Sequence, residues 1–150
     1  MGSEVFIACS VLAVDSRGRV LLQLRDSARD IENAGRITLF GGLLKDGETP
    51  AQGAVRELKE ELGVVVPVEA VEHLLIAEKS DWRGRKTLVH VLRWLGASAD
   101  VADLKEGVAL VLGEVEKLLE CPLISDVTRS SLRLHASQST NEVRARAGGC

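Results

Sequence analysis

The first part of the chain alternates between short runs of β-branched and aliphatic residues and polar turn segments. Residues 5–14 form an apolar run that ends at the turn signal Asp15-Ser16-Arg17-Gly18, and residues 20–24 resume the apolar pattern. Two such runs joined by a short glycine-containing turn predict a β-hairpin.

Residues 50–62 show a different pattern, with apolar side chains at the three- and four-residue spacing of a helix. Thr49 is a favourable N-cap, Pro50 suits the first helical position, and Gln52 can complete a capping box with Thr49. Gly63 is the expected C-terminal stop. The apolar stripe that this helix would turn toward a core consists of Ala51, Ala54, Val55, Leu58 and Leu62.

The rest of the chain predicts further strands and one more helix. In chain order, we expect a loop at 25–36, strands at 37–40, 64–77, 86–95 and 108–112, a helical turn at 114–119 and a helix at 123–135. The strand at 37–40 is expected to stop at Gly41-Gly42. Residues 136–150 are polar and predict a flexible C-terminal tail after a domain of residues 1–135. Strands around a central helix, followed by a second helix, predict an α+β fold arranged as an α/β/α sandwich.

Composition and charge limit the function classes. The chain has 150 residues, the length of one domain, and a formal net charge of −3. A protein that binds nucleic-acid polymers or anionic membranes nonspecifically relies on a basic surface, so neither partner is expected. A small phosphorylated substrate remains compatible, because bound metal ions can supply positive charge. No apolar run is long enough to span a bilayer.

The cysteines indicate the compartment. Cys9, Cys121 and Cys150 are far apart and form no Cys-x-x-Cys pair. This argues against a disulfide framework or a zinc cluster, and the start of the chain lacks a basic leader followed by an apolar stretch. We therefore expect a cytoplasmic protein.

Three glutamates of the predicted helix form an acidic cluster. Glu57, Glu60 and Glu61 are three and four residues apart, which places them together on one polar face. Like charges on a helix repel one another, and divalent cations would remove that cost. Carboxylate oxygens are the ligands that Mg²⁺ and Mn²⁺ prefer. Taken alone, the cluster is equally typical of a solvated helix face.

The segment before the helix favours a site. Gly41-Gly42 begins a loop that continues to Gly47, and Glu48 stands directly before the N-cap Thr49. Glycines let a backbone approach a ligand or adopt conformations closed to other residues. The loop therefore brings a flexible backbone and a further carboxylate to the helix that carries the acidic cluster.

The spacing of these residues resembles a complete Nudix box. Gly42 is followed after five residues by Glu48, and after seven more by the run Arg56-Glu57-Leu58-Lys59-Glu60-Glu61-Leu62-Gly63-Val64. A gapped pattern of this length is far more specific than a lone glycine motif. Weaker similarity to MutT-like members extends to residues 20–25 and 104–107. We therefore expect a Nudix fold with a mixed β-sheet.

The resemblance implies a role for each matching residue. Glu57, Glu60 and Glu61 correspond to the metal-binding glutamates, and the backbone of Gly42 would add a carbonyl ligand. Arg56 corresponds to the arginine that orients the carboxylates, with Glu48 as its partner. The implied cofactor is Mg²⁺, with Mn²⁺ as the alternative.

The resemblance also implies which residues contact the substrate and which residue accepts a proton. Arg25 matches a position that often meets substrate phosphate, Glu48 lies beside the site, and Glu106 stands where some members bring another carboxylate. The general base is expected to be Glu57 or Glu60 rather than Glu106. One departure is Phe40, which stands where many members have proline, so analogy to the substrates of proline-type members is weakened.

The leading hypothesis is hydrolysis of a diphosphate linkage in a nucleoside triphosphate, oxidised ones included, or in another nucleoside diphosphate derivative such as a sugar nucleotide. A non-hydrolytic ligand sensor is the alternative, although a sensor need not keep all three glutamates. An acidic interaction domain and an isoprenoid diphosphate isomerase are the weaker hypotheses. Trp82 is the candidate lid or base contact. The sequence leaves the oligomeric state open, with a homodimer as one candidate because dimers are common in the family.

Overall fold

The computed structural model describes residues 4–28, 31–81 and 83–148, with side chains described as far as residue 139. Trp82, the expected lid or base contact, lies outside the described residues. The elements are β1 (Phe6–Asp15), β2 (Val20–Leu24), β3 (Ile37–Thr38), β4 (Phe40–Leu43), α1 (Pro50–Leu62), a 3₁₀ turn (Val68–Ala70), β5 (Val71–Ser80), β6 (Lys86–Ala97), β7 (Ala109–Gly113), α2 (Val115–Leu119) and α3 (Asp126–Gly148).

All seven strands belong to one mixed sheet with β1 near its centre. The strand order is β3-β2-β1-β6-β5, with β4 paired to β1 and β7 paired to β2. β1 and β6 run parallel, whereas the other pairs are antiparallel. The predicted β1–β2 hairpin is confirmed, with Ala13 opposite Leu21.

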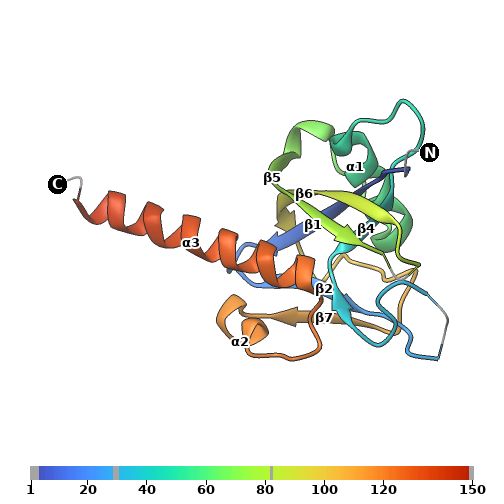
Figure 1. Cartoon of the computed structure of the whole chain (residues 1–150). Coiled ribbons are helices and arrows are strands. Elements are labelled where there is room, and N and C mark those ends of the chain that lie inside the picture. The colour runs from blue at the N-terminus through green and yellow to red at the C-terminus, as the bar shows by residue number, and fades with distance from the viewer. Residues whose placement is uncertain (1–3, 29–30, 82, 149–150) are drawn as a thin grey trace.

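The sheet separates two cores, which makes the expected α/β/α sandwich (Figure 1). Alternate residues of β1 point to opposite faces, as the pleat requires. Cys9 and Val11 pack with Leu58 of α1 on one face, and Leu12 packs with Leu132 of α3 on the other. The helix that carries the acidic cluster is thus held against the middle of the sheet by its apolar stripe.

The β1–β2 and β5–β6 hairpin turns share one local design. In each, an aspartate side chain accepts backbone N–H groups from two turn residues and the Nε–H of the arginine four positions on. Asp15 binds Arg19 in this way at 2.8 Å, and Asp81 binds Arg85 at 2.6 Å. The second turn therefore fixes Arg85 near the start of β6.

Several predicted strand limits were wrong. The segment predicted as one strand at 37–40 forms two strands, β3 and β4, and β4 continues through both glycines to Leu43. Gly41 allows this, because a Cβ at that position would overlap the carbonyl oxygen of Cys9 on β1. Only glycine lets the two backbones pair this closely. The strand predicted from residue 64 begins at Val71, since Pro67 lacks the N–H of a ladder bond.

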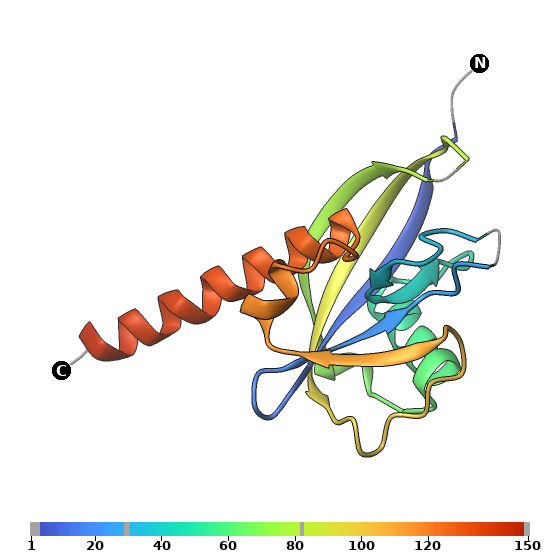
Figure 2. The ribbon, with the colours of Figure 1, turned by 90° about the horizontal axis from the view of Figure 1, so that it is seen from below.

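The final helix also differs from its predicted limits of 123–135. Leu123 and Ser125 exchange backbone hydrogen bonds with Ile37 of β3, which keeps this segment out of the helix until Asp126. The helix then runs to Gly148, because no glycine or proline interrupts it earlier, and its later turns extend away from the sheet (Figure 2). The division of the domain at residue 135 stays a prediction. Among the described helices, none is long and apolar enough to cross a membrane.

Candidate active site

The start of α1 is closed by the capping box that the sequence predicted. The Thr49 side chain accepts the N–H of Gln52 at 3.2 Å, and the Gln52 side chain accepts the N–H of Thr49 at 3.0 Å. Gly63 ends the helix in the left-handed conformation, with φ of 66°. These caps fix where the helix begins and ends, and the apolar stripe packed on the sheet sets its rotation.

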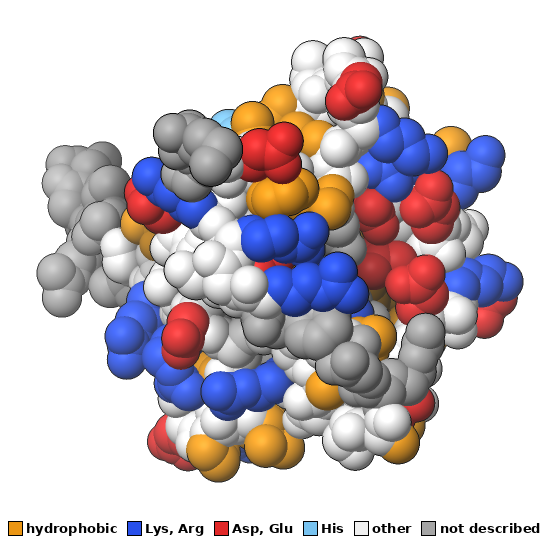
Figure 3. Space-filling view, turned by 45° about the vertical axis from the view of Figure 1, so that its right-hand side comes forward, with side chains coloured by type: hydrophobic (Ala, Val, Ile, Leu, Met, Phe, Trp, Pro, Cys, Tyr) orange, Lys and Arg blue, Asp and Glu red, His pale blue; other side chains and the backbone are white. Residues whose placement is uncertain are grey.

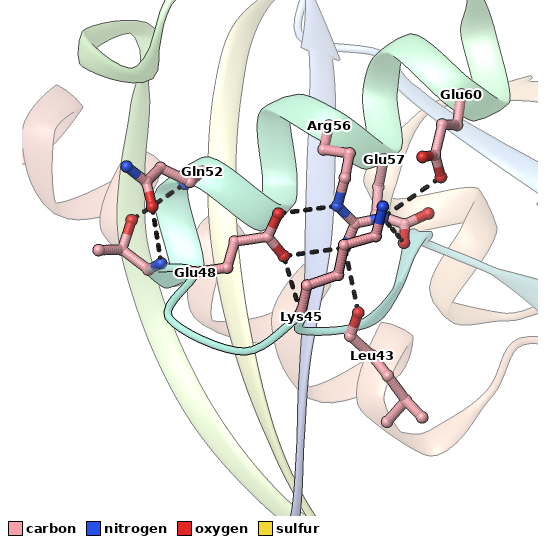
Figure 4. Close-up of polar contacts among 8 residues, drawn as sticks. Leu43, Lys45, Glu48, Gln52, Arg56, Glu57 and Glu60 are labelled. Atoms are coloured by element: carbon pink, nitrogen blue, oxygen red, sulfur yellow. Dashed lines mark hydrogen bonds and ion pairs between the residues drawn. The ribbon is translucent and has the colours of Figure 1, made fainter.

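Arg56 is the centre of the polar contacts on this helix (Figure 4). Its Nε and Nη2 donate to the two oxygens of Glu48 at 2.8 and 2.9 Å, the bidentate arrangement in which such pairs are strongest. Its Nη1 donates to Glu57 at 2.8 Å and to Glu60 at 3.3 Å, and Nη2 also donates to the Leu43 carbonyl. The structure therefore brings together Arg56, Glu48, Glu57 and Glu60 as the resemblance implied.

The acidic cluster is less exposed than the sequence predicted. We expected all three glutamates on one polar face, but only Glu60 fits this, with 51% of its side chain exposed. Glu57 is buried and Glu61 is 2% exposed. The reason is that Glu57 and Glu61, four residues apart, turn toward β4, where the Gly41 N–H donates to Glu61 Oε2 at 2.8 Å.

Burial makes negative charge costly at this point. Desolvation raises the pKa of Glu61 to about 8, with the charges of Glu57 and Glu106 adding to the shift. Desolvation likewise raises the pKa of Glu57, although hydrogen bonds from Arg56 oppose it. Hydrogen bonds from Arg56 lower the pKa of Glu48 to about 2. The site therefore contains one carboxylate whose charge is stabilised, Glu48, and two whose negative charge is made costly by burial, Glu57 and Glu61.

Glu106 reaches the site through the loop of residues 98–108. Backbone N–H groups of Asp103 and Lys105 donate to the carbonyls of Leu62 and Glu61 at the end of α1. This anchors the loop beside the acidic helix, and the charge of Glu106 raises the pKa of both Glu57 and Glu61. Glu106, the fifth carboxylate, thus acts electrostatically on the buried pair.

The donor chemistry fits a divalent cation. Within the described ranges, no group of three or more His, Cys, Asp and Glu side chains is already arranged around one metal position. Instead, Nη1 of Arg56 bridges Glu57 and Glu60. Arg56 shares its single charge among Glu48, Glu57 and Glu60, and Glu61 forms no ion pair among the described residues. These carboxylates are hard oxygen donors with an excess of negative charge, and a hard cation such as Mg²⁺ matches that need.

A cavity of about 260 Å³ opens beside β4, the strand that contains the two glycines. Its wall includes Gly41 and Gly42 together with three cationic residues, Arg25, Lys79 and Arg85. In the space-filling view, acidic side chains gather beside a group of lysine and arginine side chains (Figure 3). Within this cavity Lys79 and Arg85 form ion pairs with Glu32 and Asp81, whereas Arg25 forms none among the described residues. The acidic cluster and a cationic side chain are therefore neighbours, which suits an anionic substrate that also binds metal.

Comparison with known proteins identifies the family. The NUDIX domain model matches residues 6–118. The chain belongs to the NUDIX domain family. No curated protein matches the sequence. Membership supports cleavage of a pyrophosphate bond as the general activity of this Nudix chain.

Solved structures show the same fold. The MutT protein of Methanosarcina mazei Go1 superposes with a TM-score of 0.78 at 21% identity, over 92% of this chain and 98% of that one. A MutT NUDIX hydrolase from Burkholderia pseudomallei gives 0.75 at 24% identity, over 88% and 98%. The E. coli ORF135 protein gives 0.71 at 24%, over 90% and 91%. The expected Nudix fold with a mixed sheet is confirmed.

Two residues at the Nudix site were not singled out from the sequence. Gln23 is fully buried in β2 beside Glu61. The sequence feature that could have identified it is a lone amide side chain in an otherwise apolar strand. Gly53 lies inside α1, where a Cβ would overlap Leu44 and meet Cys9 Sγ at 3.1 Å. Its signal is a glycine in a helix interior, which costs about 1 kcal/mol relative to alanine and needs a packing reason.

Gly42→Ala is expected to reduce kcat/KM about 10- to 100-fold with little change in melting temperature. A Cβ at this position would lie 2.5 Å from Glu57 Oε1, so the carboxylate would have to turn away. The backbone itself is unstrained, because Gly42 is part of the β4 ladder. Steady-state kinetics and thermal melting measure the two effects.

Gly18→Ala is the matched control. Gly18 has φ of 78° and open space around it, far from α1 in the β1–β2 turn. The control should lose about 1 kcal/mol of stability through backbone strain and keep its activity. A Gly42→Ala variant with wild-type kcat/KM would show that Glu57 does not need its present position.

Proposed function

We propose that this chain is a divalent-metal-dependent pyrophosphohydrolase whose favoured substrates are nucleoside triphosphates, oxidised ones included. Other nucleoside diphosphate derivatives are the alternative within the class. The observation that carries the proposal is the buried pair Glu57 and Glu61, which belongs to a cluster of four carboxylates that share one arginine and lies beside a cavity whose wall includes Arg25.

The residues divide the chemistry among them. Glu57, Glu60 and Glu61, with the backbone of Gly42, would hold Mg²⁺ or Mn²⁺, which supplies charge neutralisation for the phosphates and activates water. Arg56 orients the carboxylates through its hydrogen bonds to Glu48 and Glu57. Glu57 or Glu60 accepts the proton of the attacking water. The residues predicted to contact the substrate are Arg25, Glu48 and Glu106.

The test is a release screen for phosphate and pyrophosphate over nucleoside triphosphates, 8-oxo-dGTP and sugar nucleotides, each with Mg²⁺ and with EDTA. We expect turnover that depends on Mg²⁺ and disappears after exhaustive EDTA treatment. Undiminished turnover in EDTA contradicts the mechanism. Tight nucleotide binding without any turnover would favour the ligand-sensing alternative.

The proposal places the protein in the cytoplasm, where nucleotides are abundant. Cys9 and Cys121 are free thiols, as a reducing compartment requires. A homodimer stays a prediction, to be measured by light scattering.

Arg25→Ala is expected to raise KM about 10-fold or more and to leave the fold intact. Arg25 lines the cavity, and its Nε donates to the backbone carbonyl of Glu32 at 2.7 Å. In the part of the chain that the structure describes, no carboxylate forms an ion pair with it, so its charge is available to a phosphate.

Arg85→Ala is the control within the same cavity. Its Nε lies 2.6 Å from Asp81, and its guanidinium stacks over the Phe6 ring at 4.4 Å. Because Asp81 already neutralises this charge, KM should change about 2-fold at most. Equal effects of the two substitutions on KM would contradict the proposal that Arg25 binds a phosphate group of the substrate.

A further inference from the structure

Gln23 links three parts of the active site from the buried strand β2. It is fully buried, whereas the other four residues of this strand are apolar. Its Nε2 donates to the Leu39 carbonyl at 3.3 Å and to Glu61 Oε1 at 3.5 Å. Its other amide atom faces Gly107, where a Cβ would lie 3.0 Å from Gln23 Oε1. The side chain therefore contacts Leu39 between β3 and β4, Glu61 of α1 and the loop that carries Glu106.

The orientation of this amide is determined by its neighbours. Both atoms near Nε2 are oxygen acceptors, so a flipped amide would place Oε1 against two oxygens. In the present orientation Oε1 is buried without a hydrogen-bond partner among the described residues. A buried carbonyl without a partner costs free energy. An apolar residue would fill β2 without this cost, so the fold alone does not explain the glutamine.

The contact with Glu61 explains why this position of β2 is a glutamine. Glu61 Oε2 accepts from the backbone N–H of Gly41, and Oε1 accepts from the Gln23 amide. The two donors come from different strands, β4 and β2, and each takes one oxygen. Together they determine both the position and the rotation of the carboxylate, which a single donor cannot do.

We propose that Gln23 is a positioning residue whose amide holds the Glu61 carboxylate in the orientation that binds the divalent cation. The inference rests on the proposed metal-dependent function. Residues that hydrogen-bond to metal ligands in this way commonly change metal affinity 10- to 100-fold when they are replaced.

The experiment measures Mn²⁺ binding to Gln23→Met by electron paramagnetic resonance, without substrate, beside the melting temperature of the metal-free protein. Methionine keeps the length of the side chain and removes both polar atoms. We expect the Mn²⁺ dissociation constant to rise about 10- to 100-fold. The melting temperature should not fall, because the unpartnered carbonyl is removed as well.

Gln52→Met is the matched control. Gln52 belongs to the capping box at the other end of α1 and does not contact Glu61. It should lower the melting temperature slightly and leave Mn²⁺ affinity unchanged.

The outcomes separate this inference from the proposed function. Wild-type Mn²⁺ affinity in Gln23→Met overturns the positioning role. If the wild-type protein binds no Mn²⁺, the proposed function is overturned as well. This result is seen before any variant is compared. Gln23→Leu is the second variant. If both variants fail to fold, Gln23 is a structural residue and the inference is wrong.

Discussion

Glu61→Gln is expected to lower kcat by about 1000-fold or more, while the metal-free protein melts no lower than the wild type. Glu61 is buried, and burial together with the charges of Glu57 and Glu106 raises its pKa. A neutral amide of the same shape removes a costly negative charge from the fold. The same change removes a hard oxygen ligand, so activity and stability should move in opposite directions.

The measurement is turnover with Mg²⁺ beside a thermal melt in EDTA. Glu69→Gln, an exposed glutamate in the 3₁₀ turn, is the control and should change neither value. Near-wild-type turnover in Glu61→Gln would place the catalytic metal elsewhere. A large loss of metal-free stability would show instead that Glu61 is needed for folding.

Arg56→Ala should reduce both activity and stability, unlike the glutamate change. The side chains of Arg56 and Glu48 are only 18% and 13% exposed, and the pair is bidentate. Glu48 is therefore the partner of Arg56, as the resemblance implied, and the pair is largely buried. Removal of the guanidinium leaves Glu48 and Glu57 without their charged donor, which should cost about 2–4 kcal/mol of unfolding free energy. Turnover should fall about 100-fold, because the carboxylates lose their orientation.

A double-mutant cycle with Glu48→Gln tests the pair. The second substitution should cost less when Arg56 is already absent, with a coupling of about 1 kcal/mol or more. Lys117 and Glu114 form an exposed pair at 3.8 Å, and Lys117→Ala should cost only about 0–1 kcal/mol. If Arg56→Ala melts like the wild type, or the two changes add, then Arg56 does not orient the carboxylates.

The elements that depend on local pattern were predictable from the sequence. Thr49, Gln52 and Gly63 define both ends of α1 through contacts within a few residues, and the structure contains each of these contacts. The Nudix box likewise placed Arg56 beside Glu48. Such features depend on spacing along one segment, which a single sequence shows directly.

The features that were missed depend on residues far apart in the chain. The burial of Glu57 and Glu61 follows from the approach of β4 to α1, and no helical pattern distinguishes them from Glu60. The Gln23 contact joins residues 38 positions apart. Continuation of β4 through Gly41 depends on pairing with Ser10 of β1. In each case tertiary contact overrides a local signal.

The parallel pairing of β1 with β6 has a consequence for how the protein folds. Phe6 lies opposite Thr87, so this pair closes a loop of about 80 residues, whereas the β1–β2 and β5–β6 hairpins form from neighbouring residues. Local pairs form quickly, and long-range parallel pairs must first overcome a large closure entropy. We expect the two hairpins and α1 to form early and the β1–β6 seam to close last. The core that buries Leu58 also contains Leu92 and Trp94 of β6, so the packing that supports α1 is complete only when this slowest pair has formed.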